Sequence, residues 1–356
     1  KDAKLAINAA EIAMSKWSKK SPRERSEVLR KVFELMDQRL DYFAELITLE
    51  NGKGYTDAIG EARYAAEFFR WFSEEAVRLE GSLSTAPVSK AKIMVHHKPA
   101  GIAVLITPWN YPAAMGTRKI APALAAGCSV IIKPASETPL TMLALMPILE
   151  EAGVPKGLVN VLPTDNAAVL TEKLLLDPRV RVISFTGSTS VGKIILKVAS
   201  EQVLKPAMEL GGNAPLIVFD DADLDESVNG AMLAKMRNLG EACTAANRFY
   251  IQDNIYDAFV QKFTAKMKAL KVGNGLDKSV DVGPLVNEKT ISKVEMLVND
   301  ALSKGAKILL GGKRLKNKGY FFPPTVLTDI PDNAKCLKDE IFGPVATIQK
   351  FTNQDE

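Results

Sequence analysis

From residue 99 onward, short apolar runs alternate with segments of helical character, and this alternation constrains the fold more than any other feature. Residues 102–106, 129–134 and 181–187 are such runs, and the segments between them carry apolar side chains at helical spacing. A strand that is apolar on both faces belongs in a parallel sheet that helices cover on both sides. The sequence therefore predicts an α/β fold built on a parallel sheet.

The alternation starts a second time after residues 209–213 (ELGGN), which indicates a second domain. Residues 214–219 form a further apolar run, and a long helix that includes residues 233–243 (LAKMRNLGEAC) is expected to follow. A length of 356 residues also fits about two domains. We therefore expect a domain boundary close to Gly211 and Gly212.

The residues before the first of these runs are predicted to be mainly helical. Ser21, Pro22 and Glu24 offer an N-cap, a proline at the first helical position and a capping-box glutamate. A second helix is expected over residues 62–81, with Gly81 ending it. The period then changes to that of an alternating strand, which precedes the turn at residues 99–101.

Composition and charge exclude several classes of function. The net charge is +4 and the 46 Lys and Arg residues are spread along the chain, so no nucleic-acid-binding surface is expected. No apolar run approaches the ~20 residues that a membrane-spanning helix needs. The three cysteines lie far apart, which argues against a disulfide framework or a zinc site and favours a reducing, cytoplasmic compartment.

The stretch from Phe185 to Leu196 (FTGSTSVGKIIL) is one residue short of a nucleotide phosphate loop. Its strand, glycines and following helix leave backbone N–H groups free for an anion. A phosphate loop needs a hydroxyl after its lysine to hold Mg²⁺, but Ile194 follows Lys193 here. An ATPase is therefore disfavoured, while a phosphate-binding turn and a simple tight connection both stay open.

Nucleophilic chemistry falls to cysteine, because the chain has only two histidines. His96 and His97 are adjacent in an expected strand, so their side chains should point to opposite faces. Cys128 directly precedes an expected apolar strand and is predicted to be a buried core thiol. Cys336 lies in an expected loop without an activating neighbour. Cys243 lies at the expected end of a helix among small residues, which makes it the best of the three candidates.

Six motifs together resemble the aldehyde dehydrogenase superfamily. In chain order they are ITPWNYP, KPASETP, FTGSTSVG, MELGGNAP, GEACTAANR and DEIFGPV, and they span Ile106 to Val345. Each motif alone is weak, but their order and spacing match the family. The resemblance implies the family's fold, with a Rossmann-like parallel-sheet cofactor domain and an α/β catalytic domain.

The resemblance also implies where the parts of the fold lie. The dinucleotide-binding domain covers residues 1–80 and 99–210, an oligomerisation arm covers 81–98, and the catalytic domain covers 211–356. The closing part of the family fold is expected to lie outside these residues. The resemblance also implies that the subunits assemble into a homodimer or a homotetramer.

Three residues match the catalytic positions of the family. Cys243 matches the nucleophile, whose thiolate attacks the aldehyde carbon to give a thiohemiacetal. Asn110 matches the side chain that stabilises the oxyanion together with the backbone N–H of Cys243. Glu209 matches the general base that activates water for hydrolysis of the thioester. We expect Glu209 to be buried, and burial raises the pKa of a carboxyl group. No metal ion is expected in the site.

A dinucleotide site follows from the same motifs. Lys133 matches the lysine on the adenosine ribose. Gly187 and Ser188 match the pyrophosphate turn. Glu340 and Phe342 match the residues that hold the nicotinamide ribose and ring. The other positions assigned to this site are Ile106, Thr107, Pro108, Trp109, Ser136, Val191 and Leu210.

One position bears on the choice of cofactor. Relatives that prefer NAD often carry a glutamate three residues after this lysine, where it binds the ribose hydroxyls and repels a 2′-phosphate. Ser136 stands there in this chain, and Glu137 is displaced by one residue. A neutral hydroxyl beside Lys133 suits a dianionic 2′-phosphate better than a carboxylate would. We therefore expect NADP to be preferred over NAD.

Two arginines point to an acidic aldehyde as the small-molecule substrate. Arg118 and Arg237 match arginines that bind the substrate carboxylate in the succinate-semialdehyde dehydrogenases of this family, and residues 237–249 resemble bacterial members of that subgroup. Paired guanidiniums select a short ω-carboxy aldehyde. Considered alone, Arg118 is better explained as a surface charge at the start of a helix, and Arg237 as a member of an internal ion pair.

The resemblance thus implies oxidation of succinate semialdehyde to succinate with NADP, a reaction of GABA degradation. Two alternatives stay open. One is a dehydrogenase for another short acidic or phosphorylated aldehyde, and the other is a catalytically silent binding protein of the same fold. Retention of Cys243, Glu209 and Asn110 together argues against the silent protein.

Overall fold

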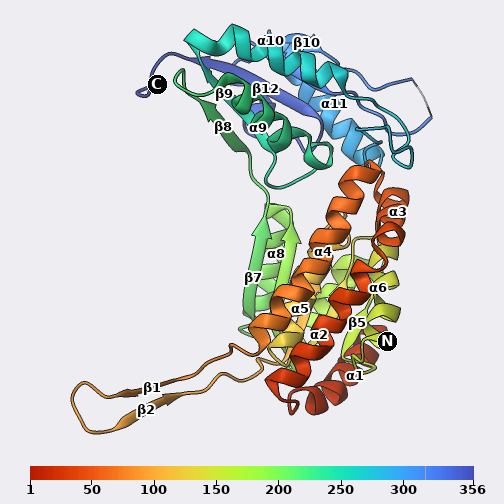
Figure 1. Cartoon of the computed structure of the whole chain (residues 1–356), viewed down its shortest axis with the longest axis vertical. Helices are drawn as coiled ribbons and strands as arrows, with labels where there is room; N and C mark the ends of the chain where they lie inside the picture. The colour runs from red at the N-terminus through yellow and green to blue at the C-terminus, as the bar shows by residue number, and fades with distance from the viewer. Residues whose placement is uncertain (317) are drawn as a thin grey trace. The chain divides into compact units, whose positions relative to one another are not determined.

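The computed structural model describes residues 1–316 and 318–356, which divide into two compact units. Unit 1 comprises Lys1–Leu46 and Ile59–Glu209, and unit 2 comprises Ile47–Ala58 and Leu210–Glu356 (Figure 1). The division after Glu209 lies close to the glycine pair at which the sequence suggests a boundary. Residues 1–80 were expected to belong to one domain, but residues 47–58 group with unit 2.

Unit 1 contains a sheet with the strand order β5-β4-β3-β6-β7. Its strands are β3 (Ile102–Ile106), β4 (Ser129–Lys133), β5 (Val159–Val161), β6 (Val180–Gly187) and β7 (Lys205–Leu210). The pairs β3–β4, β3–β6 and β4–β5 are parallel. Every residue of β3 and β4 is buried, so the predicted parallel sheet with two covered faces is confirmed.

Helices of unit 1 follow the predicted alternation. They are α1 (Asp2–Trp17), α2 (Pro22–Asp37), α3 (Leu40–Asn51), α4 (Tyr55–Ala76), α5 (Ala114–Ala125), α6 (Leu140–Glu151), α7 (Ala167–Leu175) and α8 (Thr189–Ser200), of which α3 and α4 each contribute one end to unit 2. Helix α2 begins with the predicted capping box between Ser21 and Glu24. The predicted end of α4 at Gly81 was wrong, because the chain leaves the helix after Ala76 and turns into a hairpin.

That hairpin consists of β1 (Ser82–Thr85) and β2 (Lys92–Val95), paired antiparallel. All of its strand residues are exposed, and Figure 1 shows it extending away from the helices of unit 1. The expected strand placement of His96 and His97 was wrong, because β2 ends at Val95 and both histidines lie in irregular, exposed backbone.

Unit 2 contains a sheet with the order β10-β11-β12-β9-β8. Its strands are β8 (Ala214–Val218), β9 (Ala246–Gln252), β10 (Lys307–Leu310), β11 (Thr325–Thr328) and β12 (Val345–Phe351). Its longer helices are α9 (Leu224–Met236), α10 (Asp253–Ala269) and α11 (Glu288–Ser303), and the short 3₁₀ turns are η1 (Arg237–Gly240) and η2 (Lys335–Leu337). The pairs β8–β9, β9–β12 and β11–β12 are parallel, and β10–β11 is antiparallel.

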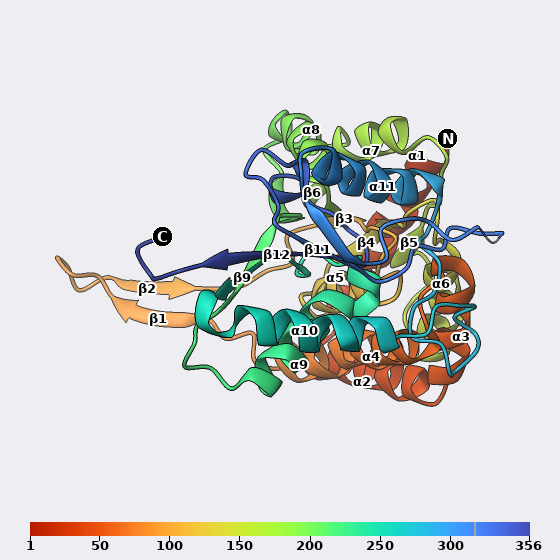
Figure 2. The same ribbon diagram turned by 90° about the horizontal axis from the view of Figure 1, so that it is seen from above.

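Helices cover both faces of this second sheet. Val326 and Ile348 belong to a core that includes residues of α9 and α10, whereas Leu327 and Val345 belong to a core built with α11. Adjacent strand residues therefore point to opposite faces, and α10 and α11 lie on opposite sides of the sheet in Figure 2. Within the described residues, no helix is both long enough and apolar enough to cross a bilayer.

Candidate active site

In unit 1, the expected cofactor residues lie at the carboxyl ends of neighbouring parallel strands. Ile106 at the end of β3 pairs with Lys133 on β4 and with Phe185 on β6. The chain passes from β3 to β4 and β5 and then returns to β6 on the other side of β3, so the strand order reverses at β3. Open α/β sheets bind ligands outside the carboxyl ends of their strands at such a switch point.

The loop after β3 carries Thr107, Pro108, Trp109 and Asn110. It is tied to the loop after β4, because the N–H of Thr107 donates to the carbonyl of Lys133 at 3.2 Å and Thr138 Oγ1 donates to the carbonyl of Trp109 at 3.4 Å. Asn110 is buried. The loop that carries the expected oxyanion donor is therefore fixed by its neighbours in the same unit.

A buried glutamate that the sequence reasoning missed anchors the other end of this loop. Oε1 of Glu61 accepts the N–H groups of Ala113 and Ala114 at 2.8 and 3.2 Å, where α5 begins. A carboxylate is stabilised at a helix N-terminus by the backbone N–H groups and the helix dipole. No local sequence signal indicates this contact, because Glu61 lies on α4, 52 residues earlier in the chain than Ala113.

The glycine turn after β6 opens directly onto the start of α8. Ser188 Oγ accepts the N–H of Val191 as the N-cap, and both side chains are exposed. A Cβ added to Gly187 would lie 2.6 Å from Cζ of Phe185, so a larger residue here would have to displace the Phe185 ring. The turn therefore presents the N-terminus of α8 to solvent, which is an arrangement that binds anions.

Lys133 and Ser136 are three residues apart in the chain and differ in exposure. Lys133 is buried at the end of β4, and burial lowers the pKa of its ammonium group while the charge of Glu137 opposes that effect. Ser136 and Glu137 are both exposed. An ammonium, an open helix N-terminus and a neutral hydroxyl form a donor set that fits a phosphorylated dinucleotide.

The expected burial of Glu209 was wrong, because its side chain is exposed. Glu209 lies on β7, which is the edge strand of its sheet and is exposed at most positions. Lys119 of α5, which the sequence reasoning did not single out, is buried and donates from Nζ to Ser184 Oγ at 2.7 Å. Burial lowers the pKa of Lys119 to about 8, and the charge of Glu209 opposes this shift.

Arg118 is held by aromatic side chains of α4. Its Nη2 donates to the hydroxyl of Tyr64 at 3.5 Å, and its guanidinium lies 5.3 Å from the ring centre of Phe68. These contacts fix the direction of a side chain that would otherwise be a mobile surface charge. Arg237, the second expected carboxylate ligand, is exposed at the start of η1 in unit 2.

In unit 2, the expected site residues lie at the amino ends of neighbouring parallel strands. Cys243 precedes β9, Glu340 and Phe342 precede β12, and Leu210 precedes β8. Because β8, β9 and β12 are adjacent and parallel, their amino ends share one edge of the sheet. A Cβ added to Gly211 would lie 2.6 Å from Oε2 of Glu340, so Gly211 permits this carboxylate to approach the backbone. Burial raises the pKa of Glu340.

Cys243 has the accessible thiol among the three cysteines. Its side chain is exposed, whereas Cys128 and Cys336 are buried, and burial raises the pKa of the Cys336 thiol to about 11. The prediction that a helix extends to Cys243 was wrong, because α9 ends at Met236. The chain reaches Cys243 through a turn with an unusual backbone instead.

Charged side chains are buried behind this turn. Lys235 is fully buried, and its Nζ donates to Asn247 Oδ1 at 3.0 Å. Burial lowers the pKa of Lys235 to about 7, with the charge of Glu340 opposing. Glu241 is also fully buried, and burial raises its pKa well above the ordinary value, with the charge of the fully buried Lys53 opposing.

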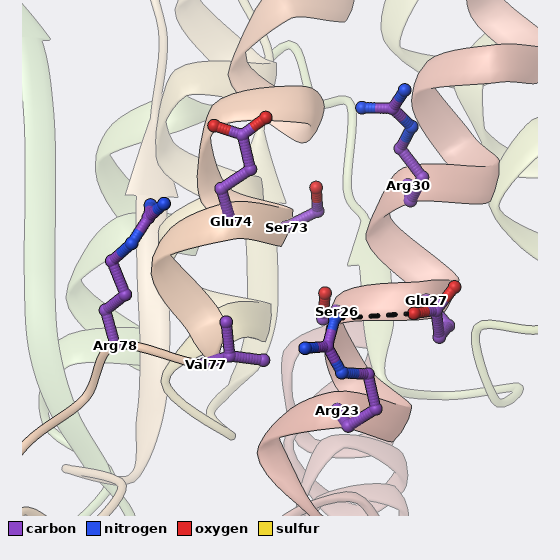
Figure 3. Close-up of a pocket in the computed structure, with 8 residues that line it drawn as sticks. All are labelled: Arg23, Ser26, Glu27, Arg30, Ser73, Glu74, Val77 and Arg78. Atoms are coloured by element: carbon purple, nitrogen blue, oxygen red, sulfur yellow. Dashed lines mark ion pairs between the residues drawn. The ribbon is translucent and has the colours of Figure 1, made fainter.

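A hollow of about 350 Å³ elsewhere in unit 1 is lined by charged residues of α2 and the end of α4 (Figure 3). Arg23, Arg30 and Arg78 line it, and each forms an ion pair with a glutamate of its own helix or its immediate extension. None of the expected site residues lines this hollow. Among the described residues, no cluster of His, Cys, Asp or Glu is arranged to hold a metal ion.

Comparison with known proteins decides the family. The whole chain, residues 1–356, matches the aldehyde dehydrogenase family. The chain belongs to the aldehyde dehydrogenase family. It is 51% identical over 355 residues to a succinate-semialdehyde dehydrogenase of Paenarthrobacter nicotinovorans, covering 100% of this chain and 79% of the relative.

Two further relatives of this aldehyde dehydrogenase are informative. A glutarate-semialdehyde dehydrogenase of Pseudomonas aeruginosa is 46% identical over 355 residues, which cover 100% of this chain and 73% of the relative. The crystal structure of an NADP-dependent enzyme of Escherichia coli superposes with a TM-score of 0.97 at 45% identity, covering 99% of this chain and 73% of the other. The aldehyde dehydrogenase fold expected from the six motifs is thereby confirmed.

Proposed function

We propose that this aldehyde dehydrogenase oxidises succinate semialdehyde to succinate, with NADP as the hydride acceptor. The observation that carries the proposal is the exposed thiol of Cys243, which stands on a constrained turn while the other two cysteines are buried. A succinate-semialdehyde dehydrogenase as a 51% identical relative supports the choice of substrate. The catalytic roles below are part of the proposal.

In the first half of the reaction, the Cys243 thiolate adds to the aldehyde carbon and forms a C–S bond. The aldehyde oxygen becomes an oxyanion, which the Asn110 side-chain amide and the backbone N–H of Cys243 stabilise. Arg118 and Arg237 hold the carboxylate at the other end of the substrate and so restrict where the aldehyde carbon can lie. A bound NADP would supply the acceptor for the hydride that this carbon loses, and Cys243 would then carry a thioester.

In the second half, Glu209 removes a proton from water, and the water oxygen attacks the thioester carbon. The C–S bond breaks, succinate leaves and Cys243 returns as a thiolate. The exposure of Glu209 on β7 supports this role, because a general base for hydrolysis must reach water.

For the cofactor, we assign the two ends of NADP to residues of different elements. Lys133 and Ser136 would hold the adenosine ribose and its 2′-phosphate, and Gly187 and Ser188 would hold the pyrophosphate. The remaining positions of this half are Ile106, Thr107, Pro108, Trp109, Val191 and Leu210. Glu340 and Phe342 would hold the nicotinamide ribose and ring.

We also propose that the β1–β2 hairpin pairs with a partner subunit in a homodimer or homotetramer. Leu83, Ile93 and Met94 are large apolar side chains that are 46–68% exposed on it, and such exposure favours association. A reducing cytoplasmic compartment would keep the Cys243 thiol available for catalysis.

A second candidate substrate is glutarate semialdehyde, which is one methylene longer. It is favoured by the glutarate-semialdehyde dehydrogenase relative, which is 46% identical over the whole of this chain. One methylene changes binding by only about 1–3 kcal/mol in an apolar pocket, so both substrates can be turned over.

Initial-rate kinetics with both cofactors test the proposal. The panel comprises succinate semialdehyde, glutarate semialdehyde, glyceraldehyde 3-phosphate and propanal. We expect the highest kcat/KM with succinate semialdehyde and NADP, and no comparable rate with propanal, which lacks the carboxylate. A kcat/KM for propanal or glyceraldehyde 3-phosphate equal to that for succinate semialdehyde would contradict the assigned substrate.

A further inference from the structure

Three consecutive residues shortly before Cys243 have left-handed backbone conformations. The φ angles are 53° at Asn238, 57° at Leu239 and 74° at Gly240. Residues with a Cβ rarely adopt this region, and runs of them are unfavourable because Cβ crowds the following carbonyl. Such a turn persists only where surrounding contacts hold it. Leu239 is almost fully buried, so the strained backbone is fixed inside unit 2.

Asp57 supplies a contact that holds this turn. Its Oδ2 accepts the backbone N–H of Asn238 at 2.9 Å, where the left-handed run begins. Asn238 then closes the turn on itself, because its Nδ2 donates to the carbonyl of Glu241 at 3.0 Å and its carbonyl accepts the N–H of Glu241 at 2.8 Å. The carboxylate of Asp57 therefore connects to the backbone that leads directly into Cys243.

The segment that leads into Asp57 packs closely against backbone of residues 273–286. A Cβ added to Gly52 would lie 2.7 Å from the carbonyl oxygen of Pro284, and a Cβ on Gly283 or Gly275 would collide with the backbone oxygens of Gly52 or Lys53. The N–H of Tyr55 donates to the carbonyl of Gly275 at 2.9 Å. Glycines on both sides of the contact thus let residues 51–57 sit against residues 273–286 with little freedom to shift.

We propose that Asp57 is a positioning residue for the nucleophile, acting through the backbone of Asn238 to hold the left-handed turn that orients Cys243. This inference rests on the proposed role of Cys243 as the nucleophile. Residues 47–58 belong to unit 2, and within it they place a carboxylate against a turn whose conformation the chain does not favour on its own.

Three variants of the full chain test the inference. Asp57→Ala removes the acceptor for the Asn238 N–H. Asp57→Asn keeps a side-chain oxygen that can accept it. Asp223→Ala is the matched control in the same unit, because Asp223 Oδ1 also accepts one backbone N–H, that of Glu226 at 2.9 Å, at the far end of α9.

We expect Asp57→Ala to lower kcat by about tenfold to a hundredfold with KM for the aldehyde and Kd for NADP within twofold of the parent, since small displacements of a reacting group cost rates of this size. Amide hydrogen exchange over residues 238–243 should quicken in the same variant. Asp57→Asn should keep kcat within about fivefold of the parent, because it restores the hydrogen bond without the charge. Asp223→Ala should lower thermal stability but leave kcat and exchange at 238–243 unchanged.

A kcat for Asp57→Ala within twofold of the parent would overturn the inference, as would an equal loss of kcat in Asp223→Ala at a matched thermal midpoint. Each variant is assayed with propanal as well as with succinate semialdehyde. If the parent oxidises propanal but not succinate semialdehyde, the proposed substrate fails, while the effect of Asp57 on kcat is still measured with propanal.

Discussion

Replacing Lys235 by Met should stabilise the protein at neutral pH, although Lys235 makes a good hydrogen bond. Lys235 is fully buried, and burial lowers the pKa of its ammonium from 10.5 to about 7. That difference corresponds to roughly 4–5 kcal/mol of cost for keeping the charged form inside, at about 1.4 kcal/mol per pKa unit. Met has a similar length and no charge. The substitution also removes the donor to Asn247 Oδ1, and leaving this buried oxygen without a hydrogen bond costs about 1–3 kcal/mol. The net gain is about 2 kcal/mol below pH 7.

The pH dependence of this gain has a definite sign. The pKa of Lys235 is lower in the folded than in the unfolded protein, so between pH 7 and pH 10.5 the unfolded chain binds more protons. Stability of the parent therefore rises through this window as far as Lys235 is concerned. The advantage of Lys235→Met is full below pH 7 and shrinks as pH rises from 7 towards 10.5, at about 1.4 kcal/mol per pH unit. It reverses at about pH 9, where the remaining cost of Lys235 falls below the cost of leaving Asn247 Oδ1 without its donor. The charge of Glu340 raises the pKa of Lys235 and so reduces the free-energy cost of burying its cation.

Urea unfolding followed by circular dichroism at pH 6, 7, 8 and 9 measures the effect, at one fixed protein concentration because association shifts apparent stability. Lys289→Met on α11 is the control, because Lys289 is exposed in the same unit and its loss should change the free energy of unfolding by less than about 0.5 kcal/mol. The reasoning fails if Lys235→Met lowers the free energy of unfolding at pH 6, or if its difference from the parent is the same at pH 6 and pH 9.

Three further outcomes are expected. Cys243→Ala should abolish aldehyde oxidation and leave the Kd for NADP unchanged in fluorescence titration; substantial remaining turnover would exclude Cys243 as the nucleophile. Ser136→Glu should move the ratio of kcat/KM for NADP over NAD toward NAD by about tenfold or more, because a carboxylate near Lys133 repels a 2′-phosphate; an unchanged ratio would contradict the assigned ribose site. Gly240→Ala should cost more than about 2 kcal/mol in urea unfolding, because a Cβ there meets the carbonyl of Gly343 and φ is 74°; a variant as stable as the parent would show that the turn can relax.

Much of the fold was predictable because its signals are local. The capping box at Ser21 and Glu24 is satisfied within one helical turn, and it forms as expected. Residues 102–106 are apolar at every position and residues 130–132 form the apolar centre of the run 129–133, which is typical of strands covered on both faces, and both runs are buried throughout. Family motifs then indicated the aldehyde dehydrogenase fold, and the whole-chain match confirms it.

What the sequence could not indicate depends on contacts between distant residues. Burial of Glu209 was expected from its neighbours, but exposure is decided by its place on an edge strand. A continuous helix up to Cys243 was expected, but the helix ends at Met236. Asn tolerates the left-handed region better than most residues, whereas Leu239 gives no local signal that it adopts this conformation. The N–H of Asn238 in that turn donates to Oδ2 of Asp57, which lies 181 residues earlier in the chain.

The sequence by itself indicated most of the helices and strands and the covered parallel sheet, because periodicity and capping act over a few residues. It also favoured Cys243 over the other two cysteines as a nucleophile, and that role stays a prediction. Tertiary structure alone decided that residues 47–58 pack with unit 2, that Lys235 and Lys53 are fully buried, and that the chain before Cys243 is held in a conformation it does not favour. The physical reason is that burial and backbone strain are set by what surrounds a residue in space.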